Sequence, residues 1–162
     1  MITGVSIRRP VPADRQALKD MIGRCSPDAI MRRFHGYRRS FPPQYLTGAL
    51  AGEDGHFALV AEVAGTSIVA LASCVVVAGD TADIAVLVED GYQRRGIGST
   101  MLRMLIGYAD HRGIATVQAT VLAEQEWILQ LMSGYGRCST TLSMGVYEVT
   151  LRREKGRPAW IG

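Results

Sequence analysis

One segment of the chain, from Gln93 to Thr100, combines residue types that can bind an anion. Gly96 and Gly98 stand two positions apart at the start of a helical apolar pattern, where glycine permits close approach and conformations closed to other residues. The N-terminus of such a helix offers unpaired N–H groups and a partial positive charge, worth about 0.3–2 kcal/mol toward an anion. Arg94 and Arg95 add guanidinium groups that match phosphate oxygens. The segment therefore predicts a pyrophosphate site.

The residues around the glycines argue against two other phosphate-binding motifs. A P-loop requires a Gly-Lys-Ser/Thr triplet, whereas here Ser99 follows Gly98 directly. A dinucleotide-binding loop requires a third glycine where Met101 stands, and too little chain follows for the remaining units of that fold. A nucleotide-binding protein of another fold and a glycine turn that serves only packing are the alternatives left open.

The apolar pattern predicts the elements that position this segment. Alternating, β-branched stretches separated by glycine turns predict strands, and apolar residues at helical spacing predict helices. Ser26, Pro27 and Asp28 are typical of a helix start. We expect one α/β domain with a strand at 5–8, helices at 14–24, 26–36 and 44–51, an antiparallel meander at 57–63, 67–77 and 83–88, a helix at 97–112, a strand at 114–122, a helix at 124–134, and a stretch at 142–151 that holds a bulge at Gly145 or a last strand.

The residues before and within the glycine segment resemble a known family. Gln93–Gly98 matches the Q/R-x-x-G-x-G/A signature of the GNAT superfamily of N-acetyltransferases, and Val86–Tyr92 is similar to that family's fourth strand and the loop after it. The expected element order agrees as well. The resemblance implies an α/β GNAT fold, with a central, mostly antiparallel mixed sheet, a splayed fourth strand and flanking helices. It also implies acetyl-CoA (coenzyme A) as cofactor.

The resemblance suggests roles for particular residues. In the family, the main chain of the fourth strand pairs with pantetheine like an added β-strand, which here concerns Val86, Leu87 and Val88. The loop and the following helix hold the coenzyme A pyrophosphate, which here concerns Gln93, Arg94, Arg95, Gly96, Ile97, Gly98, Ser99 and Thr100.

A second, shorter resemblance involves the predicted second helix. The run Ser26-Pro27-Asp28, followed by Arg33-Phe34, resembles a segment of bacterial protein-lysine acetyltransferases. The same residues equally fit a capped helix with Phe34 in the core.

Acetyl transfer requires a neutral amine, although a lysine amine has a pKa of about 10.4 in water. A nearby carboxylate can accept the proton, directly or through water. The resemblance suggests Asp83, since lysine acetyltransferases of the family usually carry a glutamate at that strand position. Glu62 and Glu124 are alternatives, and Asp83 also fits an exposed acid without a catalytic role. The family's usual general acid, a tyrosine, is replaced by Met132, and we expect the nearby Tyr135 to face elsewhere.

The histidines and cysteines predict neither a metal site nor a disulfide framework. Metal-ligand spacing is missing among the three histidines, His35, His56 and His111. No C-x-x-C pair occurs among the odd set of cysteines, Cys25, Cys74 and Cys138.

Length and composition bound the class of protein. The 162 residues fit a single domain, which we expect at 1–151, followed by a basic tail at 152–162. The longest apolar run, 68–78, is too short to cross a membrane, and the N-terminus lacks the order of a secretory signal. We therefore expect a cytoplasmic protein without a membrane partner.

The net charge of +3 does not indicate a nucleic-acid partner, because it is a balance between unlike regions. Residues 1–40 carry nine basic and three acidic side chains, and residues 91–162 carry nine and five. Residues 41–90 carry seven acidic side chains and no Lys or Arg. We expect the anionic coenzyme on the basic side and a cationic amine on the acidic side.

With the resemblance, these features predict an acyl-CoA-dependent N-acyltransferase that moves an acetyl group from acetyl-CoA to a primary amine. The amine, a protein lysine or a small molecule, attacks directly in a ternary complex. A non-catalytic acyl-CoA-binding regulatory module is the alternative. The sequence does not distinguish a monomer from a homodimer.

Overall fold

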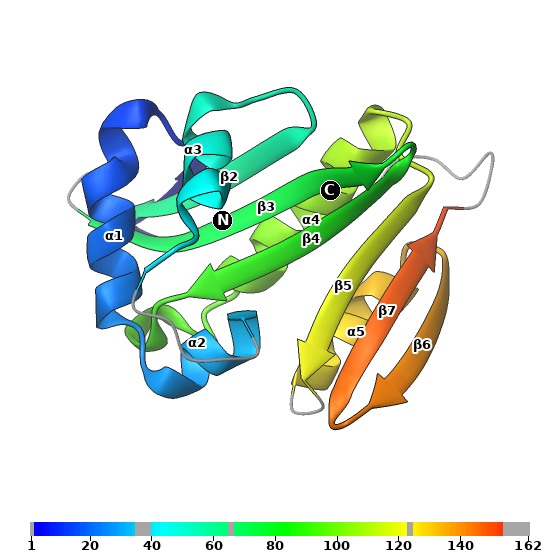
Figure 1. The fold of residues 1–162 in the computed structure, drawn as a ribbon. Helices are drawn as coiled ribbons and strands as arrows, with labels where there is room; N and C mark the ends of the chain where they lie inside the picture. The colour runs from blue at the N-terminus through cyan, green and yellow to red at the C-terminus, as the bar shows by residue number, and fades with distance from the viewer. Residues whose placement is uncertain (1, 35–39, 65–66, 123–124, 154–162) are drawn as a thin grey trace.

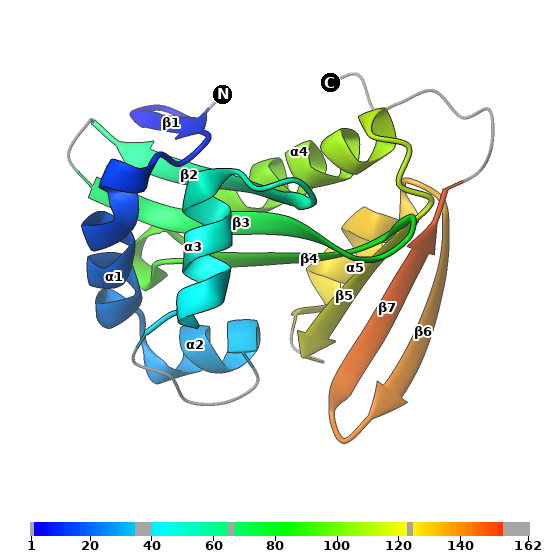
Figure 2. The same cartoon turned by 45° about the horizontal axis from the view of Figure 1, so that its top comes forward.

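The computed structural model describes residues 2–34, 40–64, 67–122 and 125–153. Its strands form one sheet in the order β1-β2-β3-β4-β5-β7-β6 (Figure 1; β1 is labelled in Figure 2). Within the described ranges, β4 and β5 are the only parallel neighbours in this sheet. The expected mostly antiparallel mixed sheet is confirmed. The strands are β1 (Val5–Arg8), β2 (His56–Val63), β3 (Ser67–Ala78), β4 (Thr81–Val88), β5 (Thr116–Leu122), β6 (Arg137–Ser143) and β7 (Val146–Arg152).

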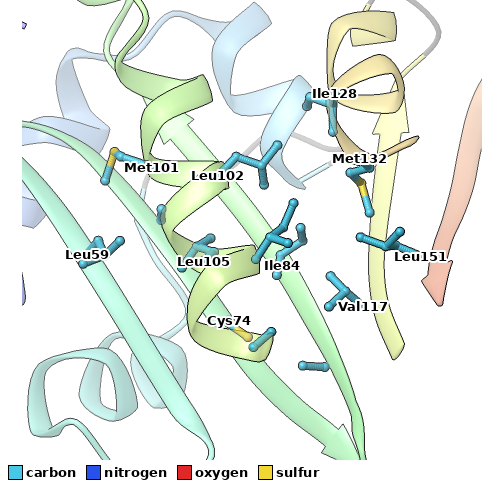
Figure 3. Packing of buried hydrophobic residues seen from close by; sticks show 14 of the residues in the cluster. Leu59, Cys74, Ile84, Met101, Leu102, Leu105, Val117, Ile128, Met132 and Leu151 are labelled. Carbon is cyan, nitrogen blue, oxygen red and sulfur yellow. The ribbon is translucent and has the colours of Figure 1, made fainter. Parts of the chain in front are cut away.

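Helices cover both faces of the sheet, so that the core has two layers. α1, α2 and α3 lie on one face, while α4 and α5 lie on the other (Figure 1, Figure 2). Buried side chains such as Met21 and Leu71 form the first layer, and Leu105 and Met132 belong to the second (Figure 3). No helix in the described part of the chain has the length and apolar character needed to span a membrane. The helices are α1 (Arg15–Arg24), α2 (Pro27–Phe34), α3 (Pro43–Ala51), α4 (Ile97–His111) and α5 (Glu126–Ser133).

β4 and β5 separate along most of their length. They pair only through Thr81–Asp83 and Thr116–Gln118. β5 pairs instead with β7 from Thr116 to Leu122, so that β5, β7 and β6 diverge from β4 as a unit (Figure 1). Beyond Asp83, the main chain of β4 therefore has no strand partner on its β5 side among the described residues. This is the splayed fourth strand that the resemblance implied.

The C-terminal segment forms a hairpin, where the sequence pattern predicted only a bulge or one last strand. β6 and β7 pair along their full lengths, and the turn between them has φ of 53° at Met144 and 79° at Gly145. Positive φ at both central residues matches the twist of a tight hairpin. β6 was missed because nearly all of its side chains are exposed, which leaves no apolar alternation to detect.

The folded part continues two residues past the predicted end of the domain at 151, to Arg153. Arg152 belongs to β7, and the Arg153 guanidinium donates to the Ile106 carbonyl at 3.2 Å and pairs with Asp110 at 2.5 Å. The rest of the predicted basic tail, 154–162, lies outside the described residues, so its character stays a prediction.

Ion pairs join the acidic middle of the chain to the basic N-terminal region. Arg8 donates to Glu62 at 2.8 Å and to both carboxylate oxygens of Asp14 at 2.8 and 2.9 Å. Arg24, at the end of α1, donates to both oxygens of Glu89 at 3.0 and 3.1 Å. These ion pairs join β1 to its neighbour β2 and join α1 to the residue that follows β4.

Candidate functional site

A pocket of about 450 Å³ lies where β4 has separated from β5, and it reaches the first turn of α4. Eight of its lining residues come from the set that the sequence predicted for coenzyme A: Val86, Leu87, Val88, Gln93, Arg94, Gly96, Gly98 and Ser99. The fold therefore brings the end of the splayed strand and the glycine segment to one space. Sequence reasoning missed the other four, which come from α2 and the start of α5: Ala29, Arg32, Gln125 and Trp127.

The two glycines serve different purposes. Gly96 has φ of 84°, in the left-handed region, and a Cβ there would meet nothing within 4 Å. Gly96 is therefore needed for its backbone conformation. Gly98 has ordinary helical geometry, but a Cβ there would lie 3.5 Å from both Trp127 and Val88. Gly98 therefore keeps open the space between the start of α4 and the end of β4.

The first turn of α4 offers backbone donors to the pocket. Gly96 supplies no side-chain cap, and the first N–H to bond back into the helix is that of Thr100, which donates to the Gly96 carbonyl at 3.0 Å. The N–H groups of 97–99 have no partner within the helix, as at any helix start. The exposed Arg94 lines the same pocket. This arrangement can hold a pyrophosphate.

Three predicted cofactor residues do not line the pocket. Ile97 is buried in the core, which anchors the start of α4. The Arg95 guanidinium lies 5.2 Å from the centre of the Tyr92 ring. The Thr100 hydroxyl donates to the Gly96 carbonyl at 2.7 Å, so it stabilises the loop.

The residues of β4 face alternately toward the two layers of the core. Leu87 packs with α1–α3, whereas Val86 and Val88 pack against the cluster that contains α4 and α5. Because strand side chains alternate, Asp83 lies on the same face as Leu87. The Gln93 amide donates to the Val88 carbonyl at 2.9 Å, which fixes the end of β4 to the loop.

Asp83 lies at the closed end of the split between the strands. It is in register with Gln118, the last residue of β5 that pairs with β4, and it directly precedes Ile84, which lines a second, narrow pocket. Its side chain is solvent-exposed and lines neither pocket. Partial burial raises the pKa of Asp83 above its ordinary value, which makes the carboxylate a better proton acceptor.

Among the described alternatives, Glu62, Met132 and Tyr135 line neither of the two pockets. Glu62, on β2, accepts a hydrogen bond from Arg8, and Glu124 lies outside the described residues. Met132 is fully buried, so the usual tyrosine position holds a core side chain. Tyr135 lines neither pocket, and burial raises its pKa.

Among the described residues, the other titratable side chains show no reactive nucleophile and no metal site. Burial raises the pKa of Cys25 and of Cys74 to about 11, so both stay thiols at neutral pH. His56 is packed 5.3 Å from the Tyr45 ring, and burial lowers its pKa. His35 lies outside the described residues, within which no three His, Cys, Asp or Glu side chains gather as metal ligands.

Contacts at the N-terminus of α2 place this helix beside the split. The Ser26 hydroxyl accepts from the Ala29 N–H at 3.1 Å, as expected of a cap. The same hydroxyl donates to one carboxylate oxygen of Asp90 at 2.5 Å, and the Ser26 N–H donates to the other carboxylate oxygen of Asp90 at 2.8 Å. Because Asp90 follows β4, α2 is tied to the strand end that borders the pocket. Arg32 reaches the pocket from this helix.

The family model described as the Acetyltransferase (GNAT) family matches residues 17–132. The match covers more than half of the chain, and the chain belongs to this family. No curated protein sequence matches it significantly.

Several solved structures share the fold. The GNAT domain of S. lividans PAT has a TM-score of 0.76 at 20% identity, over 91% of this chain and 90% of that one. The N-acetyltransferase paia from Thermoplasma acidophilum, in complex with coenzyme A, has a TM-score of 0.69 at 11% identity, over 91% and 98% of the two chains. YncA, a putative acetyltransferase from Salmonella typhimurium with its cofactor acetyl-CoA, has a TM-score of 0.68 at 19% identity, over 96% and 98%.

Proposed function

We propose that this protein is an N-acetyltransferase that uses acetyl-CoA to acetylate a primary amine, a protein lysine or a small molecule. One observation carries the proposal: the end of β4 that has separated from β5 and the N-terminus of α4 border a common pocket. Similar folds with coenzyme A and with acetyl-CoA bound support this choice of donor.

The residues present fit the chemical groups of coenzyme A. The N–H groups of 97–99 and the Arg94 guanidinium suit its pyrophosphate. The main chain of 86–88 has no strand partner on its β5 side among the described residues, and this side suits the amides of pantetheine, as in other cases of strand addition. Trp127 is 42% exposed and lines the pocket beside Gly98, so it offers an apolar wall to the same arm. Arg95, Ile97 and Thr100 support the loop without lining the pocket.

Asp83 is the proposed general base. When bound, acetyl-CoA supplies a thioester whose carbonyl carbon accepts the amine in a ternary complex. Asp83 takes the proton of the attacking amine through a water molecule, because Asp83 directly precedes Ile84 of the second pocket but does not itself line either pocket. With Met132 at the usual tyrosine position, we assign no acid for the leaving thiolate among the described residues, and a thiol pKa of about 8.5 allows the thiolate to leave unprotonated.

The test combines binding and turnover. Wild type and Asp83→Asn are titrated with coenzyme A and then assayed with acetyl-CoA and a panel of amines and lysine peptides. We expect equal binding of coenzyme A and a loss of about 100-fold or more in turnover. An unchanged rate in Asp83→Asn would refute the assignment of the base. Stabilisation by ATP or NAD but not by acetyl-CoA would refute the choice of donor.

A non-catalytic acyl-CoA-binding module is the second candidate function. The buried Met132 favours it, since the usual acid is missing. Tight binding of acetyl-CoA without transfer to any member of the panel would support it over an enzyme.

A cytoplasmic location is part of the proposal. The three cysteines are all unpaired, which agrees with a reducing compartment.

A further inference from the structure

The sheet has two outer strands, β1 and β6, and they differ in how they are protected against an added strand. β1 spans four residues, ends at Arg8, and is followed by Arg9 and Pro10. Short length, charge and proline are features that discourage pairing at an exposed edge. β6 spans seven residues, and its first residue, Arg137, is its only charged one. β6 is thus a long, nearly uncharged edge with no strand on its outer side among the described residues.

The turn of the hairpin shows which main-chain groups of β6 point outward. Ser143 and Val146 flank the two turn residues, so they form the first hydrogen-bonded pair of the ladder. Along an antiparallel ladder, such pairs alternate with pairs whose N–H and C=O groups point away from the partner strand, and β6 and β7 keep one register throughout. The N–H and C=O groups of Cys138, Thr140 and Leu142 therefore point away from β7, toward the open edge.

The same three residues share the core-facing side of the sheet. They lie opposite Leu151, Val149 and Tyr147 of β7, which pack in or against the core cluster that contains α4 and α5. Leu142 is nevertheless 57% exposed. The edge of β6 thus combines outward main-chain groups with an apolar side chain left open on the core side of the sheet.

A second copy of this strand matches the edge. When two β6 strands lie antiparallel about an axis at Thr140, Thr140 faces itself and Cys138 faces Leu142 of the second copy. All three residues with outward main-chain groups then fall in hydrogen-bonded pairs, so that each N–H and each C=O has a partner. Each Leu142 packs beside the half-buried Cys138 of the other copy, on the core side of the combined sheet.

Charge also favours the antiparallel arrangement. Arg137 and Arg152 lie directly opposite each other at one end of the β6–β7 hairpin, and both are exposed. The exposed Glu148 lies on the same face, nearer the turn at the other end. Antiparallel pairing brings the basic end of each hairpin beside the end of the other that carries Glu148. Parallel pairing would place the arginines of both copies together, which like charges disfavour.

We infer that this protein forms a homodimer in which the two β6 strands join the two sheets edge to edge about a twofold axis. This interface goes beyond the proposed function and does not depend on it, because β6 lies at the outer side of the β5–β7–β6 unit, away from the split with β4. None of the described residues that line the two pockets belongs to β6, so the pockets are not part of the interface.

A cross-link tests the register of the two strands. Hydrogen-bonded pairs place their Cα atoms about 5.5 Å apart, a distance that a disulfide spans. In Leu142→Cys, we expect oxidation with diamide to join the introduced thiol to the native Cys138 of the second copy, which gives a covalent dimer on a non-reducing gel. Within one chain, the two positions lie four residues apart along a strand, too far to bond. Cys138→Ser/Leu142→Cys and Ser143→Cys are the matched controls, and both should run as monomers.

Sedimentation equilibrium measures the dimer itself. We expect its dissociation constant to rise about tenfold or more in Thr140→Lys, because two ammonium groups then face each other at the axis. Thr140→Gln, of similar length and without charge, is the matched control and should stay close to the wild type. High salt should restore part of the association of Thr140→Lys. Thr140→Pro removes an outward N–H and spares the β6–β7 ladder, so it should also dissociate while its circular dichroism stays unchanged.

Three results would overturn the inference. One is a wild type that sediments as a monomer at every concentration tested. Another is a dimer that withstands both Thr140→Lys and Thr140→Pro and that Leu142→Cys does not cross-link, which would place the interface elsewhere. The third is slow hydrogen exchange of the N–H groups of 138, 140 and 142 in a monomer, since another segment of the same chain would then cover the edge. Failure of the wild type to bind coenzyme A would instead refute the proposed function and leave the interface standing.

Discussion

Gly98→Asp places a negative charge at the proposed pyrophosphate site, and its comparison with the uncharged Gly98→Asn distinguishes the effect of charge from that of shape. A Cβ at Gly98 would lie 3.5 Å from Trp127 and from Val88, which is an ordinary contact, so the free protein accommodates the side chain. A carboxylate in the first turn of α4 interacts favourably with the helix end, by about 0.3–1 kcal/mol. We therefore expect the variant to fold and to unfold at the same temperature as wild type or slightly above it.

The same carboxylate opposes the ligand. At roughly 5 Å from a phosphate charge, the repulsion is about 1 kcal/mol with the dielectric constant of water and about 3 kcal/mol with that of a protein surface. A pyrophosphate carries two such charges, so we expect a loss of at least about 2 kcal/mol, or roughly 30-fold in Kd.

Calorimetric titration with coenzyme A at two salt concentrations measures this effect, with Gly98→Asn as the control of equal shape. Asn should weaken binding less than Asp, and the difference between the two variants should shrink as salt screens the charge. Equal affinities for the Asp and Asn variants would contradict a pyrophosphate at this helix end.

Three further predictions concern single side chains. In a Trp160→Phe background, the fluorescence of Trp127 should change saturably with coenzyme A, and an unchanged spectrum would place the ligand elsewhere. Asp83→Asn should raise the free energy of unfolding near pH 7, because burial raises the pKa of Asp83 and so disfavours the charged form of its carboxyl. Denaturant titrations should show that this gain in stability disappears below about pH 4, where the carboxyl is protonated in both the folded and the unfolded state. Asp14→Asn should lower the free energy of unfolding by about 1–2 kcal/mol at pH 7, because Arg8 holds the pKa of Asp14 below its usual range. This loss should vanish as the pH falls through the pKa of folded Asp14, and a loss independent of pH would refute the ion pair as its cause.

Features that depend on neighbours in the chain were predictable. The Ser26 cap, the left-handed Gly96 and the buried side of α4 follow from local rules, and the structure contains all three. The meander and the order of the helices were also recognised, because their apolar periods are strong. β6 was the exception, since its exposed side chains carry no period.

The proposed catalytic side of the site was less predictable. Asp83 was proposed only through a resemblance, and Arg32 and Trp127 were not assigned to the site at all. Trp127 fits the apolar face of a helix, and nothing in its spacing shows that it borders a pocket. Arg32 is one of two adjacent arginines, and the surface that its side chain reaches depends on where α2 packs against the sheet.

The sequence by itself determined the glycine turn that we propose to bind the pyrophosphate, because a glycine with positive φ, a helix start and a flanking arginine are neighbours in the chain. Only the tertiary structure decided what surrounds that turn. The split between β4 and β5 exists because β5 pairs with β7, and α2 reaches the split because Ser26 bonds to Asp90. These contacts join residues that are far apart in sequence, where periodicity and local preference carry no information.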